Sequence, residues 1–233
     1  MIDEMEYIDL AEQFIAAHFP KASTAVIGGS TSRGERTATS DIDLLLIGDD
    51  LLGADQIGMA TCLEFRGEIF EVFAYTPDGF QEWAERSIAQ HRPVIVNMLV
   101  EGLAVRRGDD FDALRGTWAA RLAAGPSVEA HEFSFRRYVI TDVLDDLRDA
   151  TDPLEQRVLA STLFERMSEL MLLSAGKWVG TGKYLPRRLR ELPAQRVNAL
   201  AAPFLQGDIG GFSDAVESEL DAVGGRVQAG FIR

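Results

Sequence analysis

The sequence predicts an α+β chain, in which a β-sheet flanked by helices is followed by a C-terminal α-helical bundle domain. Two observations support this prediction. Short β-branched or alternating apolar runs, which are typical of strands, occur almost only before about residue 109. Beyond that point, apolar residues recur at helical spacing. The composition is that of a folded protein with a sizeable core, since 46% of the 233 residues are apolar and 26% are charged.

The N-terminal half shows a helix first and strands after it. Apolar residues recur at helical spacing over 5–18, and a proline follows. Strands are predicted at 24–27, 41–47, 62–65 and 68–74. The last two are expected to form a hairpin about Arg66 and Gly67. Asp78 is expected to cap a helix that Pro93 ends.

The C-terminal half is predicted to be helical. Ser127 is expected to cap a helix that runs through Asp149. Asp152 and Pro153 have the N-cap and first-turn preferences of a second, longer helix. Shorter helices are expected to be separated at Pro186, Pro193 and Pro203. The predicted domains are 1–108, 109–223 and a flexible tail, 224–233, that begins with two glycines.

The net charge of −14 is unevenly distributed. Residues 1–110 contain 20 acidic and 8 basic residues, whereas residues 111–233 contain 17 and 15. Within the second half, the segment 177–196 has six basic residues and one acidic residue. An acidic protein with one short basic segment repels a long polyanion, so nucleic acid is disfavoured as a partner. A small polyanion such as a nucleoside triphosphate stays compatible with this distribution.

Several classes of protein are excluded by composition. No apolar run approaches the about 20 residues that a membrane span needs, and the acidic N-terminus does not resemble a secretory signal. Cys62 is the only cysteine, and the three histidines lack metal-ligand spacing, which argues against a disulfide framework and a zinc site. We therefore expect a cytoplasmic protein with no membrane partner.

A glycine-rich turn follows the first predicted strand. Gly28, Gly29 and Ser30 come directly after the strand 24–27. A turn of this composition lets backbone N–H groups approach phosphate oxygens closely. The alternative is an ordinary loop between two strands. The residues that follow the turn argue against this alternative.

Those residues include paired carboxylates. Asp41 and Asp43 are two residues apart on a predicted strand, so both side chains point to the same face. Two carboxylates on one face repel each other unless a cation lies between them, which indicates one or two Mg²⁺ ions that bridge to phosphate. Glu71 is a third carboxylate, and it interrupts an apolar strand. The three residues together predict a metal site.

The motif resembles that of a known superfamily. Gly29-Ser30, ten intervening residues and Asp41-Ile42-Asp43 resemble the signature of the DNA polymerase beta-like nucleotidyltransferases. The segments 29–34 and 40–45 are similar to those of small bacterial members, including minimal nucleotidyltransferases and antibiotic-adenylating enzymes. The helical half, with 182–185, resembles the substrate domains of the kanamycin nucleotidyltransferase-like group.

The resemblance implies a nucleotidyltransferase-type mixed β-sheet and a Mg²⁺-dependent transfer of a nucleoside monophosphate, with AMP expected, from an NTP to a hydroxyl. Asp41, Asp43 and Glu71 would be the catalytic and metal-binding residues and would hold two Mg²⁺ ions. Glu71 could in addition serve as the general base. The triphosphate contacts would include Gly28, Gly29, Ser30 and Arg33. Arg33 is interpreted either as a phosphate contact or as an anchor of the loop.

The basic segment 177–196 is a second candidate for nucleotide binding. A triphosphate carries about four negative charges, which two Mg²⁺ ions only balance, so the three carboxylates leave a need for further cations. Lys183 and Arg187 are the residues expected to supply them, with plain surface charge as the alternative. Glu165 and Glu169 share one helical face and are weaker candidates for the acceptor side, for which a solvated face is favoured.

The expected partner is a small-molecule acceptor such as an antibiotic. The acidic first half suits a cationic acceptor, for instance an aminoglycoside, although acidity also serves solubility. An alternative is a toxin–antitoxin-type nucleotidyltransferase that adenylylates a protein, and another is a non-catalytic nucleotide-binding module. The fused helical half favours the small-molecule enzyme, and the three carboxylates favour catalysis. Formation of a homodimer is compatible with the sequence.

Overall fold

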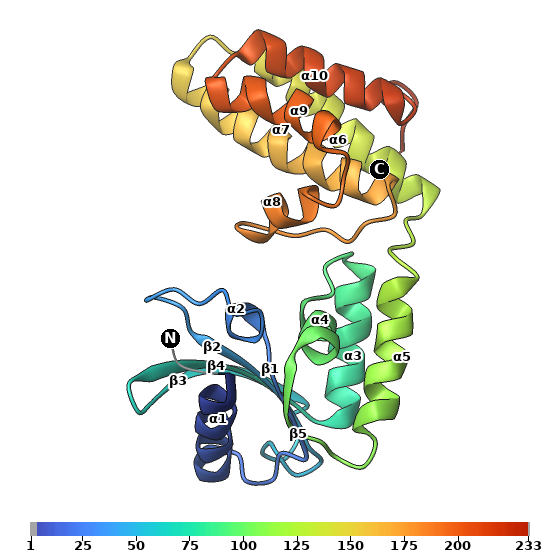
Figure 1. Cartoon of the computed structure of the whole chain (residues 1–233). Coiled ribbons are helices and arrows are strands. Elements are labelled where there is room, and N and C mark those ends of the chain that lie inside the picture. The colour runs from blue at the N-terminus through green and yellow to red at the C-terminus, as the bar shows by residue number, and fades with distance from the viewer. Residues whose placement is uncertain (1–3, 233) are drawn as a thin grey trace. The chain divides into compact units, whose positions relative to one another are not determined.

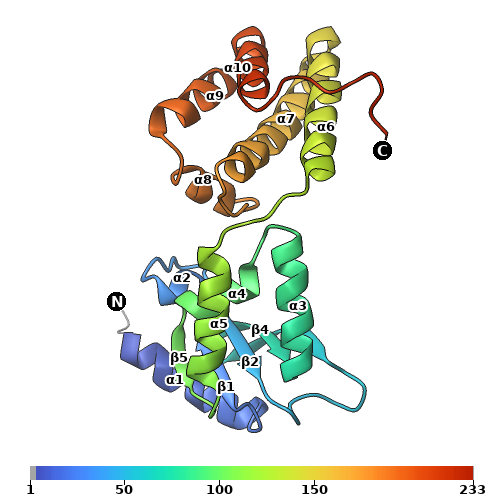
Figure 2. The same ribbon diagram turned by 90° about the vertical axis from the view of Figure 1, so that its right-hand side faces the viewer.

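A computed structural model describes residues 4–232 of the chain (Figures 1 and 2). Residues 1–3 of the predicted domain 1–108 and Arg233 of the predicted tail lie outside the described residues. The chain forms two compact units, 1–124 and 125–233. The first contains a β-sheet with helices and the second is helical, which confirms the predicted α+β class. No helix within 4–232 is long and apolar enough to cross a membrane.

The first unit is built on a five-stranded mixed sheet in the order β3-β4-β2-β1-β5. The strands are β1 (Thr24–Ile27), β2 (Ile42–Ile47), β3 (Gly58–Phe65), β4 (Glu68–Tyr75) and β5 (Leu103–Arg106). β2 and β4 pair in parallel, whereas the other neighbours are antiparallel. The turn between β3 and β4 has positive φ at both Arg66 and Gly67, the combination of a type I′ hairpin turn. The predicted hairpin is therefore confirmed.

Helix α1 (Glu4–His18) packs on one face of this sheet (Figure 1). Its residues Phe14 and Ile15 are fully buried, and the Phe14 ring stacks on Phe70 of β4 with 4.1 Å between the ring centroids. The alternate residues of β2, Ile42, Leu44 and Leu46, join the same apolar cluster. Because side chains alternate across a strand, the residues between them face the other side of the sheet.

The remaining helices of the first unit are α2 (Gly29–Ser32), α3 (Pro77–Ala89), α4 (Val94–Glu101) and α5 (Phe111–Ala123). The N-cap of α3 is Thr76, whose side chain accepts a hydrogen bond from the Gly79 N–H, and not the predicted Asp78, which lies in the first turn. Asp78 is an acidic residue where the helix dipole favours one, but Thr76 precedes the Pro77 that opens the helix.

The boundary between the units lies after Ala124 and not at the predicted 108/109. Helix α5 belongs to the first unit because it packs against α4. Its Trp118 is buried, and the ring meets Phe80 of α3 edge-on. The loss of strand patterns after about residue 109 therefore marks the end of the sheet and not the end of the first unit.

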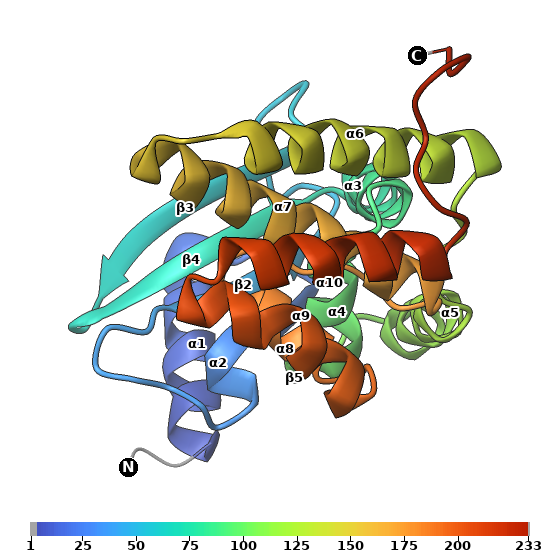
Figure 3. The ribbon, with the colours of Figure 1, turned by 90° about the horizontal axis from the view of Figure 1, so that it is seen from above.

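The second unit consists of α6 (Ala130–Asp149), α7 (Pro153–Ser174), α8 (Tyr184–Leu189), α9 (Ala194–Gln206) and α10 (Ile209–Ala222). α6 packs against α7 and α10 around one apolar core (Figure 3). Asp152 caps α7 as predicted, because its side chain accepts from two backbone N–H groups. Ser127 lies before α6, whose N-cap is Glu129, and Pro203 lies inside α9 without ending it.

The segment predicted as a flexible tail packs on α6. Arg226 forms ion pairs with Asp145 and with Glu217, the latter at 3.1 Å. The Phe231 ring lies parallel to Tyr138 of α6, with 5.4 Å between the centroids. The glycines at 224–225 indicated the end of the helix correctly. The segment beyond them is held against α6 by these contacts and by hydrogen bonds such as the one from Gln228 to Asp145.

Candidate active site

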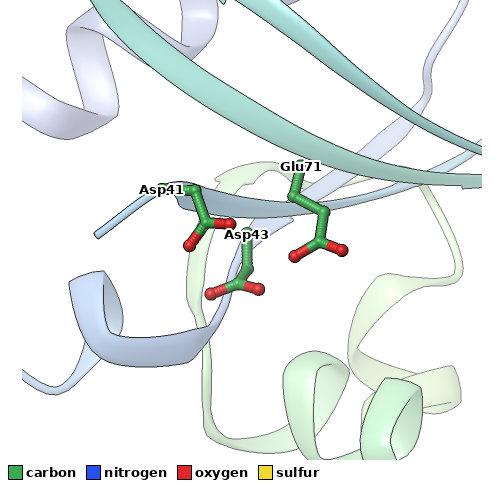
Figure 4. Close-up of side chains that lie close together, drawn as sticks. All are labelled: Asp41, Asp43 and Glu71. Atoms are coloured by element: carbon green, nitrogen blue, oxygen red, sulfur yellow. The ribbon is translucent and has the colours of Figure 1, made fainter. Parts of the chain in front are cut away.

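Three carboxylates meet on the sheet of the first unit (Figure 4). Asp41, Asp43 and Glu71 each offer an oxygen atom within 4.8 Å of the other two. All three side chains are partly buried. Within residues 4–232 no other group of three or more acidic, histidine or cysteine side chains comes together in this way.

The parallel ladder of β2 and β4 brings these carboxylates together. Asp43 is the register partner of Glu71, so the two side chains stand side by side on the same face of the sheet. The flanking residues Ile42 and Phe70, also register partners, point into the α1 side of the sheet. Asp41 comes one residue before β2 and reaches the same place from the end of the preceding loop.

The electrostatics of the cluster affect Glu71 most. Burial raises the pKa of the Glu71 carboxyl above its ordinary value, and the negative charges of Asp43 and Asp41 raise it further. The protonated carboxyl can also donate a hydrogen bond to either aspartate, which acts in the same direction. A cluster with this property takes up a cation or a proton to reduce its own repulsion. Carboxylate oxygens are the ligands that Mg²⁺ prefers, so the three residues fit this metal.

The glycine-rich turn lies against the same cluster. The Gly28 N–H donates a 2.8 Å hydrogen bond to the main-chain carbonyl oxygen of Asp43. Gly29 has φ +63°, and a Cβ atom at this position would lie 1.6 Å from Oδ2 of Asp43. Only glycine fits there without displacing the carboxylate, because it has no side chain and accepts positive φ. Gly29 and Ser30 begin the single turn of α2, and both are partly exposed.

The loop that follows α2 contains two arginines with different surroundings. Arg33 is exposed, and its Nε–H donates to Glu35 at 3.1 Å. Arg36 is more buried and holds several oxygen atoms around the start of β2. Of the two roles considered for Arg33, anchoring of the loop is carried out by Arg36. The phosphate contact stays a prediction for Arg33. Nothing in the motif spacing distinguishes Arg36, so sequence reasoning missed it.

Lys183 and Arg187 belong to the second unit, at the start of α8 and within it. Both lie against the ring of Tyr184: Lys183 Nζ is 5.6 Å and Arg187 Cζ is 5.2 Å from its centroid. The predicted contribution of the two cations to nucleotide binding stays a prediction.

The second unit also has a cavity of about 350 Å³ between α6 and α7. It is lined by Glu132, Phe135, Arg136, Val139, Ile140 and Arg166. Beside it, Glu169 is buried and lies 3.1 Å from Arg136 and 3.9 Å from Arg166. The favoured interpretation of Glu169 as part of a solvated face is therefore wrong, because two arginines compensate a charge that the helix packing covers.

Comparisons with known proteins agree with this geometry. Residues 8–98 match the model of the nucleotidyltransferase domain family. A solved structure of a nucleotidyltransferase-like protein from Exiguobacterium sibiricum 255-15 is similar with a TM-score of 0.52 and 12% sequence identity, over 93% of this chain and 75% of that chain. At this identity the likeness shows the fold alone. No curated protein sequence matches the chain.

Proposed function

We propose that this chain, a member of the DNA polymerase beta-like nucleotidyltransferase superfamily through its residues 8–98, transfers a nucleoside monophosphate, AMP by preference, from an NTP to a hydroxyl of a small-molecule acceptor such as an antibiotic. The observation that carries the proposal is the convergence of Asp41, Asp43 and Glu71 beside the glycine-rich turn. Three converging carboxylates next to a glycine-rich turn suit a phosphate chain that arrives with divalent cations.

Asp41, Asp43 and Glu71 are the residues that would hold two Mg²⁺ ions. Mg²⁺ bound there supplies Lewis-acid stabilisation of the phosphate oxygens and makes the acceptor hydroxyl more acidic. Burial and the negative charges of Asp43 and Asp41 raise the pKa of Glu71 in the chain itself, and bound cations would act in the opposite direction by favouring the ionised carboxylate.

The residues of the chain then have distinct roles in the transfer. The backbone N–H groups of Gly29 and Ser30 and the Ser30 hydroxyl orient the triphosphate. The Gly28 N–H holds the main chain of Asp43 by donating to its carbonyl oxygen. Glu71 takes the proton of the acceptor hydroxyl while the hydroxyl oxygen attacks the α-phosphorus. The new O–P bond forms while the bond from the α-phosphorus to the bridging oxygen breaks, and pyrophosphate leaves with the electron pair.

The acceptor class is inferred from the second unit. The helical unit, with its cavity lined by apolar and charged side chains, supports a small molecule as acceptor. A hydroxyl on a partner protein would require the same chemistry from the first unit. A non-catalytic nucleotide-binding module would not require three converging carboxylates, so that alternative is disfavoured.

Incubation with each α-³²P-labelled NTP and Mg²⁺ tests the proposal. Aminoglycosides, lincosamides and lysate protein are offered as separate acceptors, and the Asp43→Asn variant serves as the control. We expect label from ATP to appear in a small-molecule fraction only with the wild-type chain. Label in the protein fraction would instead support adenylylation of a protein. Equal labelling by the wild type and Asp43→Asn would contradict the assignment of the site.

A further inference from the structure

The three carboxylates of the triad are not held equally well by the sheet. The parallel ladder between β2 and β4 begins at Ile42 and Phe70, and it pairs Asp43 with Glu71. Backbone hydrogen bonds on both sides therefore fix these two residues. Asp41 comes before the first paired residue of β2, at the end of the loop from α2. Its place beside the other two carboxylates must depend on contacts outside the ladder.

Arg36 supplies such contacts to the segment that carries Asp41. One terminal nitrogen, Nη1, donates to the Asp41 carbonyl oxygen at 3.3 Å and to Oγ1 of Thr31 at 3.1 Å. The other, Nη2, donates to the Ser40 carbonyl oxygen at 2.9 Å and to Oε2 of Glu68 at 2.5 Å. The guanidinium thus binds the two residues that lead into β2.

The same side chain is itself held in place. Only 15% of the Arg36 side chain is exposed, and its Cζ lies 4.8 Å from the centroid of the Tyr7 ring of α1. Glu68, its carboxylate partner, is the first residue of β4, the strand that carries Glu71. Arg36 therefore connects the Asp41 segment to α2, to α1 and to the strand of the third carboxylate. A planar guanidinium can hold this many acceptors in fixed directions, whereas a lysine ammonium cannot.

We propose that Arg36 is a positioning residue of the metal site. It holds Asp41 close enough to Asp43 and Glu71 for the three carboxylates to bind metal together, and it acts through Asp41 without binding the nucleotide. The inference rests on the proposed function, since it assigns the triad to divalent cations. It separates Arg36 from Arg33, which is exposed and pairs with Glu35 in the same loop.

Direct binding of Mn²⁺, measured from the EPR signal of the free ion without nucleotide, tests the proposal. We expect Arg36→Ala to weaken Mn²⁺ binding about 10- to 100-fold, the range found when groups that orient metal ligands are removed. Arg36→Lys keeps the charge and loses the fixed geometry, so we expect most of that loss to remain. The matched control is Arg86→Ala. Arg86 also pairs with one carboxylate, Glu82, and lies over one aromatic ring, Trp83, and this variant should bind Mn²⁺ like the wild type.

Two further measurements separate positioning from other roles. The Arg36→Ala/Asp41→Asn double variant should bind Mn²⁺ no more weakly than Asp41→Asn alone, because both changes remove the same ligand. In the transfer assay, high Mg²⁺ should restore much of the kcat of Arg36→Ala but not that of Asp41→Asn. Glu68→Gln replaces the charged partner of the guanidinium by a neutral amide and so weakens a single contact, and we expect it to weaken Mn²⁺ binding severalfold even where Arg36→Ala does not fold.

The outcomes are distinguishable. Unchanged Mn²⁺ affinity in Arg36→Ala, or in Glu68→Gln where only that variant folds, overturns the inference. So does an additive loss in the double variant, or a rise in the KM for NTP at unchanged Mn²⁺ affinity, which would make Arg36 a nucleotide contact. Absence of Mn²⁺ binding to the wild-type chain, or equal binding by wild type and Asp43→Asn, overturns the proposed function together with the inference.

Discussion

The two units treat carboxylates in opposite ways. In the first unit, Asp41, Asp43 and Glu71 lie close to one another, and their mutual repulsion contributes to the raised pKa of Glu71. In the second unit, Glu169 is more deeply buried, yet it lies against Arg136 and Arg166. The difference teaches that the depth of a carboxylate does not mark a functional site. The convergence of three like charges on one face of the sheet is what makes the first cluster the candidate site.

Replacement of a carboxylate of the triad should have the largest effect on activity. We expect Asp41→Asn and Asp43→Asn each to lower the rate of nucleotidyl transfer by about 100-fold or more, because Lewis-acid stabilisation amounts to several kcal/mol. The melting temperature of the variants without metal should rise or fall only slightly, since each change also relieves repulsion. Steady-state transfer kinetics and thermal melts in chelator measure the two quantities. Wild-type activity in both variants would remove the triad from the mechanism.

Replacement of Glu169 should show the reverse pattern. Glu169→Gln leaves two arginines without their shared carboxylate, and we expect it to lower the free energy of unfolding by about 1–3 kcal/mol. Transfer per folded molecule should be retained. Chemical denaturation and transfer kinetics on the same preparation measure this. Loss of transfer at unchanged stability would contradict a purely structural role and indicate that Glu169 binds the acceptor.

Smaller effects are expected from the basic segment. We expect Lys183→Ala and Arg187→Ala each to raise the KM for NTP about fivefold, the equivalent of one typical hydrogen bond worth about 1 kcal/mol. Raised salt should partly reproduce this effect. Arg190→Ala changes an exposed residue of the same segment and is the control. Wild-type KM values in both variants would leave the helical unit with acceptor recognition alone.

The smallest effect concerns stability and pH. Because the pKa of Glu71 is raised in the folded chain, its contribution to stability is fully present below the pKa of the unfolded chain, about 4.3. It is lost as the pH rises through the folded pKa. Without metal, Glu71→Gln should therefore be more stable than the wild type at neutral pH, by no more than about 1 kcal/mol in this partly exposed cluster.

Denaturation of both proteins in chelator between about pH 4 and pH 8 measures this difference. The advantage of Glu71→Gln should disappear toward the acid end, where the wild-type carboxyl is protonated. An advantage that grows as the pH falls would show that the charge of Glu71 stabilises the fold.

Local patterns predicted the sheet and the triad well. The β-branched run at 24–27 and the alternation at 41–47 are visible without tertiary information, and a spacing of two on a strand places Asp41 and Asp43 on one face. The four-residue β5 and the apolar helix α4 were missed. Both are too short to show a period, and they take their form from packing against β1.

The role of Arg36 and the end of the first unit could not be predicted from the sequence, because both depend on residues far away in the chain. Arg33 and Arg36 lie three residues apart in one polar loop and look alike in composition. Only the folded positions of Glu68 and Tyr7, far away in the chain, make Arg36 the anchor of the loop. The end of the first unit was missed for the same reason, since Trp118 belongs to it by virtue of the surface it packs on.

Calorimetric titration with a non-hydrolysable ATP analogue tests the central claim, that the triad holds divalent cations for a nucleotide, without knowledge of the acceptor. The titration is carried out on the wild type and on Asp43→Asn, each in Mg²⁺ and in excess chelator. We expect binding to the wild type in Mg²⁺, with a corresponding rise in melting temperature, and at least about tenfold weaker binding under the other three conditions. Equal affinity of the wild type in Mg²⁺ and in chelator would contradict it.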